Sequence, residues 1–280
     1  MKRDLLAILI LVLGLAPPPA RAQQTTRGVD RLYVLDCGRG TAPNQGRFSP
    51  GYNDGKPFDL SDNCYLIRHA QGYLLWGTGI PDRFLDIPSG VPAYGGRPNW
   101  IVNKGLAKQL EQLGVKPSEV RYIGIANSHI DHVGNLAMFP TAAILIQKAE
   151  WDFIQKWFQP EMVDEARIKT DKGMTKIEGD YDVFGDGTAV IIATPSVTPG
   201  NQSLLLKLPK TGAIVHSGDL IHFQYGWDHR MVPSNVWNKE KTVESFQRLS
   251  DVIAQNNAQF WIEHDIAQGD TRKLAPDYYE

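Results

Sequence analysis

Short apolar runs bounded by glycine, proline and polar residues recur along most of the chain, a pattern typical of strands buried in a sheet. It predicts strands at residues 31–36, 63–68, 73–76, 122–126, 142–146, 189–193, 204–208, 213–216 and 260–262. The runs 204–208 and 213–216 are separated by Pro209-Lys-Thr-Gly212, so we expect them to form a hairpin.

Three other segments space their apolar residues at the helical period. They lie at 106–113, which Gly114 ends, at 148–158 and at 243–255. The second segment is rich in aromatic residues, most of which we expect in the core and one or two at the mouth of a cleft: Trp151, Phe153, Trp157 and Phe158. Strands and helices follow one another without a sequence repeat, a pattern consistent with an α+β fold.

A segment rich in glycine, proline and asparagine, from Gly38 to Leu60, separates the first two predicted strands. A loop of this length inside a compact domain is usually functional. Its aromatic residues Phe48, Tyr52 and Phe58 are candidates for the wall of a substrate cleft. The alternative is that they pack the loop onto the body of the domain.

The first 22 residues have the pattern of a secretory signal peptide. Lys2 and Arg3 precede an apolar run from Leu5 to Ala16, and Ala20-Arg21-Ala22 has the small-x-small pattern of a cleavage site. The apolar run, of about 12 residues, is too short to span a bilayer as a helix. We therefore predict a periplasmic or secreted protein whose mature chain, residues 23–280, is one domain with no stable membrane insertion.

Composition narrows the possible partners. Removal of the leader leaves 26 basic and 30 acidic residues, a net charge of −4, without a basic block, so neither nucleic acid nor an anionic membrane is indicated. A small molecule is the expected partner, and the oligomeric state does not follow from the sequence. Cys37 and Cys64 are the two cysteines, and in an oxidising compartment they form either a disulfide or two buried thiols.

Residue types that bind metals cluster after the predicted strand 122–126. His129, Asp131 and His132 leave the end of a buried strand together, where a loop can gather their side chains around one point. Two imidazoles and a carboxylate within four residues are ligands that zinc prefers. The spacing favours a metal site over the alternative, a polar loop whose histidines cap a helix.

The segment Asn127-Ser-His-Ile-Asp-His132 resembles the signature loop of the metallo-β-lactamase superfamily, His-x-His-x-Asp-His, with asparagine at the first histidine position. Further motifs follow in the family's order at 194–200 (TPSVTPG), 217–219 (SGD) and 263–265 (EHD). Residues 62–69 and 147–150 are similar to secreted members of the N-acyl-homoserine lactonase type. The resemblance covers most of the mature chain and implies a four-layer αββα sandwich.

By this resemblance, one of the family's two metal half-sites is altered and the other is retained. The first takes histidines at the positions of Asn127, His129 and Val197, and with two of the three replaced we expect it to hold no metal. The second maps onto four residues that can hold one zinc ion: Asp131, His132, Asp219 and His264. The alternative is a vestigial site in which these four hydrogen-bond one another without metal. Gly77 stands where relatives carry an aspartate that braces the metal loops.

The resemblance also implies catalytic roles. Asp131, the proton shuttle of two-metal relatives, is expected to act here as a ligand. His129 is then left to act as general base toward a water whose pKa zinc lowers. Either zinc or Asn127 would polarise the carbonyl group of the substrate.

Four more histidines and one arginine complete the candidates. His222 stands where many lactonases carry a tyrosine that hydrogen-bonds the substrate carbonyl, and a surface histidine is the alternative. His229 and Arg230 are possible contacts to a carboxylate or amide of the substrate. His69 and His216 lie inside strand patterns, and we expect both to be structural.

Three functions remain open. The first is a zinc-dependent hydrolase that opens a small cyclic ester, with lactones such as N-acyl-homoserine lactones preferred. The second is β-lactam hydrolysis, because the same site can open either ring. The third is a non-catalytic relative that binds a small molecule in the old cleft, which the substitutions at Gly77, Asn127 and Val197 favour. Retention of all four ligands of the second half-site favours a hydrolase.

Overall fold

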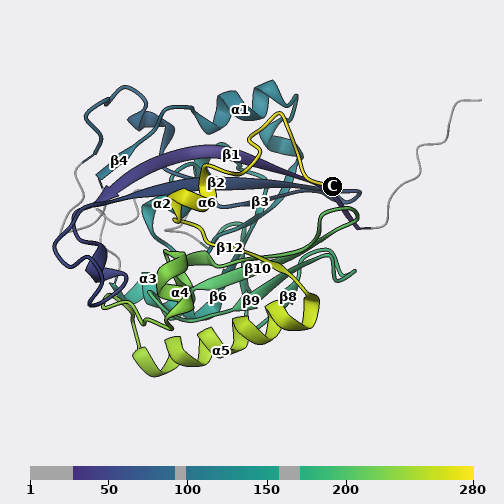
Figure 1. Cartoon of the computed structure of the whole chain (residues 1–280). Coiled ribbons are helices and arrows are strands. Elements are labelled where there is room, and N and C mark those ends of the chain that lie inside the picture. Colours follow the sequence, from purple (N-terminus) through teal and green to yellow (C-terminus); the bar gives the residue numbers. More distant parts are fainter. Residues whose placement is uncertain (1–27, 92–98, 158–170) are drawn as a thin grey trace, which may run out of the picture.

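Two sheets packed face to face form the centre of the molecule (Figure 1). The computed structural model describes residues 28–91, 99–157 and 171–280. One sheet has the strand order β4 (Asn99–Ile101), β1 (Val29–Ala42), β2 (Phe58–His69), β3 (Gly72–Trp76), β5 (Val120–Gly124), β6 (Ala143–Gln147) and β7 (Met174–Ile177). The other has the order β12 (Gln259–Trp261), β11 (Gly212–His216), β10 (Gln202–Leu208), β9 (Ala189–Ala193) and β8 (Tyr181–Asp182).

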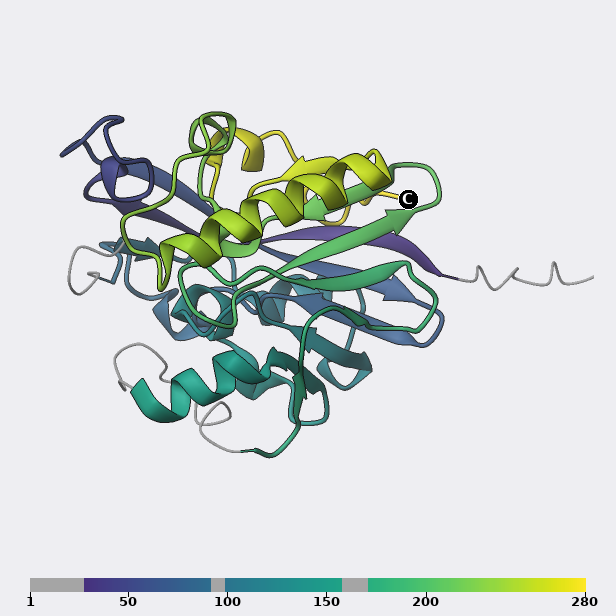
Figure 2. The same ribbon diagram turned by 90° about the horizontal axis from the view of Figure 1, so that it is seen from below.

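Helices cover the outer faces of both sheets (Figures 1 and 2). The helices α1 (Leu106–Gln112) and α3 (Lys148–Trp157) pack on the seven-stranded sheet, and α5 (Lys239–Asn256) packs on the five-stranded sheet. Short helices complete the loops: α2 (Ile130–Val133), α4 (Gln224–Asp228) and α6 (Ile266–Gly269). The layers are thus helix, sheet, sheet, helix, the αββα sandwich that the resemblance implied.

Strand alternation distributes the apolar residues among three core layers. In β1, Leu32 and Val34 point between the sheets, whereas Leu35 packs toward α1. In β10, Leu204 lies between the sheets and Leu205 packs toward α5. Because successive side chains of a strand point to opposite faces, both faces of each sheet are covered and the strands read as continuous apolar runs.

The predicted strands and helices are present, and most boundaries lie within two residues of the prediction. The predicted loop from Gly38 to Leu60 is too long, because β1 and β2 continue as an antiparallel pair through Thr41↔Asp59 after a bulge between Asp36 and Gly38. The extension is rich in polar residues, so it lacks the apolar run on which the strand prediction relied. Helix α5 begins four residues before its predicted start, where the Asn238 side chain accepts the backbone N–H of Lys241, a common N-cap.

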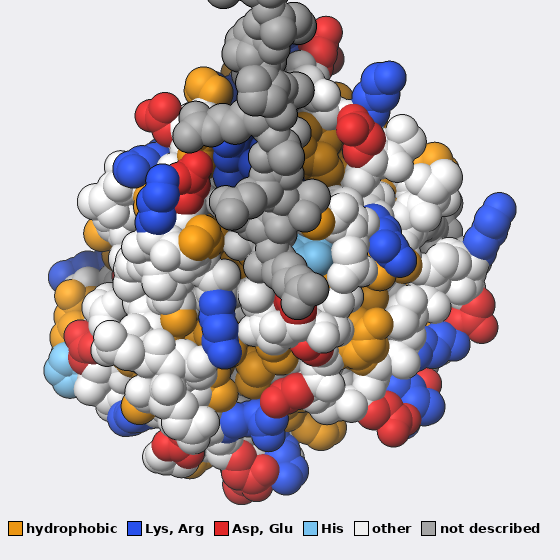
Figure 3. All heavy atoms as spheres, turned by 90° about the vertical axis from the view of Figure 1, so that its right-hand side faces the viewer, with side chains coloured by type: hydrophobic (Ala, Val, Ile, Leu, Met, Phe, Trp, Pro, Cys, Tyr) orange, Lys and Arg blue, Asp and Glu red, His pale blue; other side chains and the backbone are white. Residues whose placement is uncertain are grey.

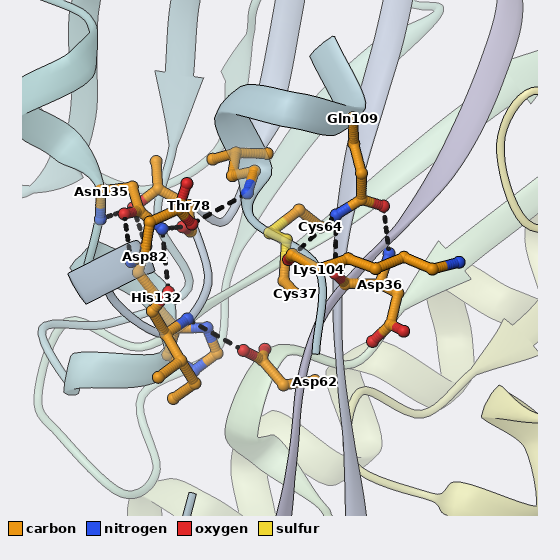
Figure 4. The surroundings of a disulfide bond; sticks show 12 residues. Asp36, Cys37, Asp62, Cys64, Thr78, Asp82, Lys104, Gln109, His132 and Asn135 are labelled. Carbon is orange, nitrogen blue, oxygen red and sulfur yellow. Dashed lines mark hydrogen bonds between the residues drawn. A yellow bond between two sulfur atoms is a disulfide. The ribbon is translucent and has the colours of Figure 1, made fainter. Parts of the chain in front are cut away.

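A disulfide joins Cys37 of β1 to Cys64 of β2, with Cα atoms 5.8 Å apart (Figure 4). This observation decides between the two alternatives that the sequence left open. The bridge packs against Gly79, where an added Cβ would lie 2.4 Å from the Cβ of Cys37. The backbone at Gly79 has a φ of +65°, which favours glycine. The disulfide thus lies directly behind the loop 77–79, which contacts the metal-binding residues described below.

One face of the described surface is mixed in charge. On the side of the molecule where the chain ends, acidic and basic side chains are interspersed (Figure 3). Within the described ranges no helix is long and apolar enough to cross a membrane. The predicted signal peptide lies outside the described residues, as does Phe158.

Candidate metal centre

The ends of β5, β11 and β12 bring four buried side chains to one point. Asp131 and His132 come from α2, which begins six residues after the end of β5, whereas Asp219 and His264 follow β11 and β12. One ligand atom from each of the four lies within 4.8 Å of all the others. Two carboxylates and two imidazoles at this spacing suit a divalent cation such as zinc, and they leave room for water as a further ligand. The structure therefore assembles the four residues that the sequence predicted.

Asp219 and His264 are aligned by hydrogen bonds. The Oδ1 atom of Asp219 lies 3.1 Å from Nε2 of His132 and 3.1 Å from Nε2 of His264. The Nε2 atom of His264 also lies 3.4 Å from a carboxylate oxygen of Asp131. On the other edge of the ring, Nδ1 of His264 donates to the carbonyl oxygen of Ser61 at 2.8 Å. This bond fixes the tautomer that presents Nε2 to a metal.

The four side chains shift one another's pKa values. Burial alone would lower the pKa of His132, but Asp219 and Asp131 outweigh burial and raise this pKa to about 10. Burial alone would also lower the pKa of His264, but the attraction and hydrogen bond of Asp219, together with the attraction of Asp131, raise this pKa well above its usual value. Burial acts on Asp219 in the opposite direction, yet His132 and His264 hold the pKa of its carboxyl well below the usual range. A cation that binds here must therefore displace protons from the imidazoles.

The altered half-site is filled by an amide network. Asn127 is fully buried, and its Nδ2 donates to Asp219 Oδ2 at 3.0 Å and to Asn201 Oδ1 at 3.2 Å. Its Oδ1 accepts the backbone N–H of His129 at 2.9 Å. Both amide hydrogens of Asn127 are thus engaged, and the side chain does not line the cavity. The prediction that Asn127 polarises a substrate carbonyl is therefore not supported.

Glu150 holds two loops of the site together. One oxygen accepts the backbone N–H of Ser128 at 2.8 Å and the Ser128 hydroxyl at 2.6 Å. The other oxygen accepts the N–H of Gly200 at 3.1 Å. Glycine is required at position 200 because a Cβ there would lie 2.3 Å from Glu150. The loop carrying Asn127 and the loop carrying Val197 are therefore fixed relative to each other, although neither residue is a usual zinc ligand.

Hydrogen bonds from Thr78, Asn135 and Asp62 brace α2 and the loop behind Gly77. The backbone N–H and the hydroxyl of Thr78 donate to the carbonyl oxygen of His132 at 2.9 and 3.1 Å. Asn135 donates to the carbonyl oxygens of Thr78 and Ile80 at 2.8 and 2.9 Å. Asp62, from β2, accepts the N–H of Ile80 (Figure 4). These bonds hold the loop 77–80 in place, although Gly77 itself offers no carboxylate.

A cavity of about 250 Å³ opens onto the four-residue site. Asp131, Asp219 and His264 form its base, and His129 lies beside them. Its apolar wall comes from distant parts of the chain: Phe48, Leu60, Trp100, Phe153 and Val197. One predicted aromatic residue of α3 and one of the β1–β2 loop therefore line the cavity, whereas Trp151 belongs to the core.

The remaining aromatic residues of the β1–β2 loop pack onto the body of the domain. Tyr52 stacks on Tyr225 with ring centroids 3.7 Å apart, and Phe58 packs edge-on against Phe223 at 4.2 Å. Phe48 therefore lines the cavity, whereas Tyr52 and Phe58 pack this segment onto the domain, so each of the two predicted alternatives applies to different residues.

His222 is a buried wall of the cavity. Its ring lies 4.3 Å from that of Phe48 and 5.1 Å from that of His264. Burial, which outweighs the opposing attraction of Asp219, lowers the pKa of His222 to about 3. The ring is therefore neutral at neutral pH, and its Nδ1 has no hydrogen-bond partner among the described residues.

The structure does not bring His229 and Arg230 to the cavity, so their predicted contact with substrate is not supported. The Nδ1 of His229 bonds to the carbonyl oxygen of Tyr225, and Arg230 donates to Ser250 on α5 at 2.7 Å. Helix α4 ends just before them and turns both side chains away.

His69 and His216 are structural, as predicted. His69 pairs with Asp186 at 2.9 Å, and His216 accepts the indole N–H of Trp76.

Four further cavity residues were not among the predicted site residues: Arg47, Trp100, Thr198 and Asn235. Thr198 lies within the motif 194–200, whereas the other three lie in loops and at a strand distant from the metal motif and had no signal in the sequence. Backbone contacts explain why Asn235 reaches the site. Ser234 donates to the carbonyl oxygen of Arg47, and Trp237 donates to that of Ser196 at 2.7 Å. The segment between them therefore runs along the edge of the cavity.

This fold and this donor set define a metal-dependent member of a known superfamily. The family model described as the metallo-beta-lactamase superfamily matches residues 58–251. The chain belongs to the metallo-β-lactamase superfamily.

Similar proteins within that superfamily are lactonases. The N-acyl homoserine lactonase AttM of Rhizobium johnstonii is 30% identical over 267 residues, which cover 89% of this chain and 98% of the relative. The N-acyl homoserine lactonase of Bacillus cereus is 28% identical over 254 residues, which cover 89% and 99%. A solved N-acyl homoserine lactone hydrolase, with the product N-hexanoyl-L-homoserine bound at its catalytic metal centre, is 25% identical. The match covers 90% of this chain and 100% of the solved chain, with a TM-score of 0.78.

Proposed function

We propose that this protein is an exported, zinc-dependent hydrolase that opens a lactone of the N-acyl homoserine type and holds one metal ion. The observation that carries the proposal is the buried cluster of Asp131, His132, Asp219 and His264 at the base of a cavity. The similarity to lactonases over nearly their whole length supports the choice of substrate class.

The four clustered side chains would hold the zinc ion. When bound there, zinc supplies Lewis acidity toward a carbonyl oxygen and lowers the pKa of water. The fully engaged amide of Asn127 and the apolar Val197 support one metal ion rather than two, because neither offers a ligand on the other side of Asp219.

His129 has the position of a general base. It lines the cavity, its side chain is 29% exposed, and its Nδ1 lies 3.4 Å from Oδ2 of Asp219. An imidazole there can accept a proton from an attacking water, and the carboxylate of Asp219 stabilises the resulting imidazolium. Because Asp131 is part of the metal cluster, it orients the site rather than carrying this proton.

His222 has the position of a hydrogen-bond donor to the substrate carbonyl. As a neutral ring it can carry its hydrogen on Nδ1, the atom that has no partner among the described residues. A buried donor of this kind stabilises charge that develops on a carbonyl oxygen.

Export to the periplasm or the medium completes the proposal. The leader-like residues 1–22 support it, and so does the Cys37–Cys64 disulfide, since such bonds persist in oxidising compartments.

The test combines metal content with ring opening. The mature protein, purified without chelator, should carry about one zinc per chain by elemental mass spectrometry, and it should hydrolyse N-hexanoyl homoserine lactone in a proton-release assay. His264→Ala should lose the metal and reduce hydrolysis by roughly a thousandfold or more. His229→Ala, a change of the same type outside the cavity, should alter neither.

Two outcomes contradict the proposal. A protein that takes up no zinc, even after incubation with it, would be a non-catalytic relative that binds a small molecule in the cavity. A zinc protein that hydrolyses nitrocefin but no lactone has the right metal and the wrong substrate class.

A further inference from the structure

The Cys37–Cys64 disulfide lies at a bulge of the seven-stranded sheet, and both cysteines are buried. Cys37 is the extra residue of the bulge in β1, since its neighbours Asp36 and Gly38 pair with consecutive residues of β2. Bulges commonly stand next to active sites. No step of the proposed reaction uses the bridge, so its place beside the metal centre needs another explanation.

The loop 77–80 packs directly on this disulfide (Figure 4). A Cβ added at Gly79 would lie 2.9 Å from the sulfur of Cys37 and 3.0 Å from that of Cys64. Both distances are shorter than a side chain tolerates, so no free space separates the backbone of Gly79 from the bridge. The N–H of Ile80 donates to the carbonyl oxygen of Cys37 at 3.3 Å, which ties the loop to the same strand.

The other side of the loop holds α2. The carbonyl oxygen of Gly79 accepts the N–H of Gly134, the residue that follows α2, at 3.0 Å. A Cβ at Gly134 would lie 2.4 Å from that same oxygen, so the loop and the helix end are in direct contact. Thr78 donates twice to the carbonyl oxygen of His132. The loop is thus one layer of backbone between the disulfide and the helix that carries Asp131 and His132.

This packing connects the bridge to the metal ligands. Two thiols need more room than a disulfide, because sulfur atoms that are not bonded stay at van der Waals distance. The wider pair would press on Gly79, and a displaced Gly79 would move its partner Gly134 at the end of α2. Metal–ligand distances must lie within about 0.2 Å of their usual values, so even a small displacement of α2 lowers the affinity for zinc.

We propose that the Cys37–Cys64 disulfide is a positioning element of the metal centre, so that zinc affinity depends on whether the bridge is closed. The proposal rests on the zinc site of the proposed function and not on the choice of substrate. Loss of a group that supports a metal ligand typically weakens metal affinity by about 10- to 100-fold, and we expect an effect of this size. An exported chain then acquires its full zinc affinity only when its two thiols have been oxidised.

The experiment compares two states of one sequence. Residues 23–280 are purified free of metal with both cysteines reduced, and half of the sample is treated with oxidised glutathione. Its disulfide takes two electrons and two protons from the two thiols and is released as two molecules of reduced glutathione. Thiol counts on denatured samples establish each state. After the redox reagents are removed, competition with a chelating dye should show that the oxidised protein binds zinc about 10- to 100-fold more tightly.

A variant without thiols gives an independent measurement, because free thiols can themselves bind zinc. Cys37→Ala with Cys64→Ala should bind zinc about tenfold or more weakly than the oxidised wild type, since Gly79 loses the sulfur atoms on which it packs. A bridge that only stabilises the fold would lower the melting temperature and leave the zinc affinity of the folded protein unchanged. Affinities are therefore measured well below the melting temperature of each protein.

Gly79→Ala tests the contact while the bridge stays intact. The added Cβ would lie 2.4 Å from the Cβ of Cys37, so this variant should lose about tenfold or more in zinc affinity with no free thiol. Gly114→Ala is the matched control, because Gly114 has a similar φ of +69° and nothing within 4 Å of an added Cβ. It should bind zinc like the wild type.

Equal zinc affinities of the oxidised and reduced proteins overturn the proposal, and so does wild-type affinity in Gly79→Ala. A protein that binds no zinc in either state overturns it together with the proposed function. A zinc affinity that follows the bridge in a protein that opens no lactone supports the positioning role and contradicts only the enzymatic reaction.

Discussion

The two oxygens of Asp219 face two different half-sites. Oδ1 meets the imidazoles of His132 and His264, both at 3.1 Å. Oδ2 meets the amide of Asn127 at 3.0 Å and the partly exposed ring of His129 at 3.4 Å. One carboxylate therefore separates a set of metal ligands from a hydrogen-bonded network.

Asn127 forms a complete set of hydrogen bonds at the altered half-site. Every polar atom of the Asn127 side chain is paired, whereas an unpaired polar group at a fully buried position would be costly. The amide of Asn127 donates a hydrogen bond to Oδ2 of Asp219. The comparison teaches that one buried carboxylate can pair with two imidazoles through one oxygen and with an uncharged donor through the other.

The strongest way to sharpen this comparison is to change His129. If it acts as the base and not as a ligand, His129→Gln should reduce kcat by roughly 10²- to 10⁴-fold while the zinc content stays at that of the wild type. Stopped-flow kinetics and metal analysis of the same preparation measure both. Loss of zinc in this variant would assign His129 to the metal site.

The pH dependence of zinc affinity tests the retained half-site. The pKa of His132 is raised to about 10 and that of His264 well above its usual value, so both rings are protonated at neutral pH before metal binds. Zinc must displace one to two protons, and its affinity should rise by about ten- to a hundredfold per pH unit between pH 6 and 8. Competition with a chelating dye measures it.

The same shifts affect the stability of the metal-free protein. Because the folded-state pKa of His132 is about 10, above the usual 6.5, its charged ring contributes stability that is complete below about pH 6.5 and is lost as the pH rises through about 10. The raised pKa of His264 acts in the same direction. In the zinc titration, an affinity that does not change between pH 6 and 8 would show that the rings of His132 and His264 are neutral before the metal binds.

Local patterns in the sequence predicted the elements and the metal ligands. The run before Asn127 reads as a buried strand, and the clustered His129, Asp131 and His132 follow it directly, so short-range information was sufficient. The layering and the assignment of Asp219 and His264 needed the family resemblance. Periodicity does not say which distant loops meet.

The parts that the sequence did not predict depend on long-range contacts between loops. Asn235 reaches the cavity because its neighbours bond to Arg47 and Ser196, which lie far away in sequence. His229 has a more suggestive residue type, yet α4 turns it toward Tyr225. Residue type therefore identified the chemistry of the site, and backbone hydrogen bonds between loops decided which polar residues enter it.

The smallest expected change, from one zinc to two, tests whether the altered half-site still has the family's geometry. Glu150 holds the loops of Asn127 and Val197 together through Ser128 and Gly200, so Asn127→His with Val197→His should place three imidazoles beside Oδ2 of Asp219. We expect about two zinc ions per chain in this double variant by elemental mass spectrometry. Asn127→His alone should stay near one, since two imidazoles and a shared carboxylate make an incomplete zinc site. A double variant that also stays at one zinc would mean that Asn127 and Val197 do not stand at the ligand positions of the family's first half-site.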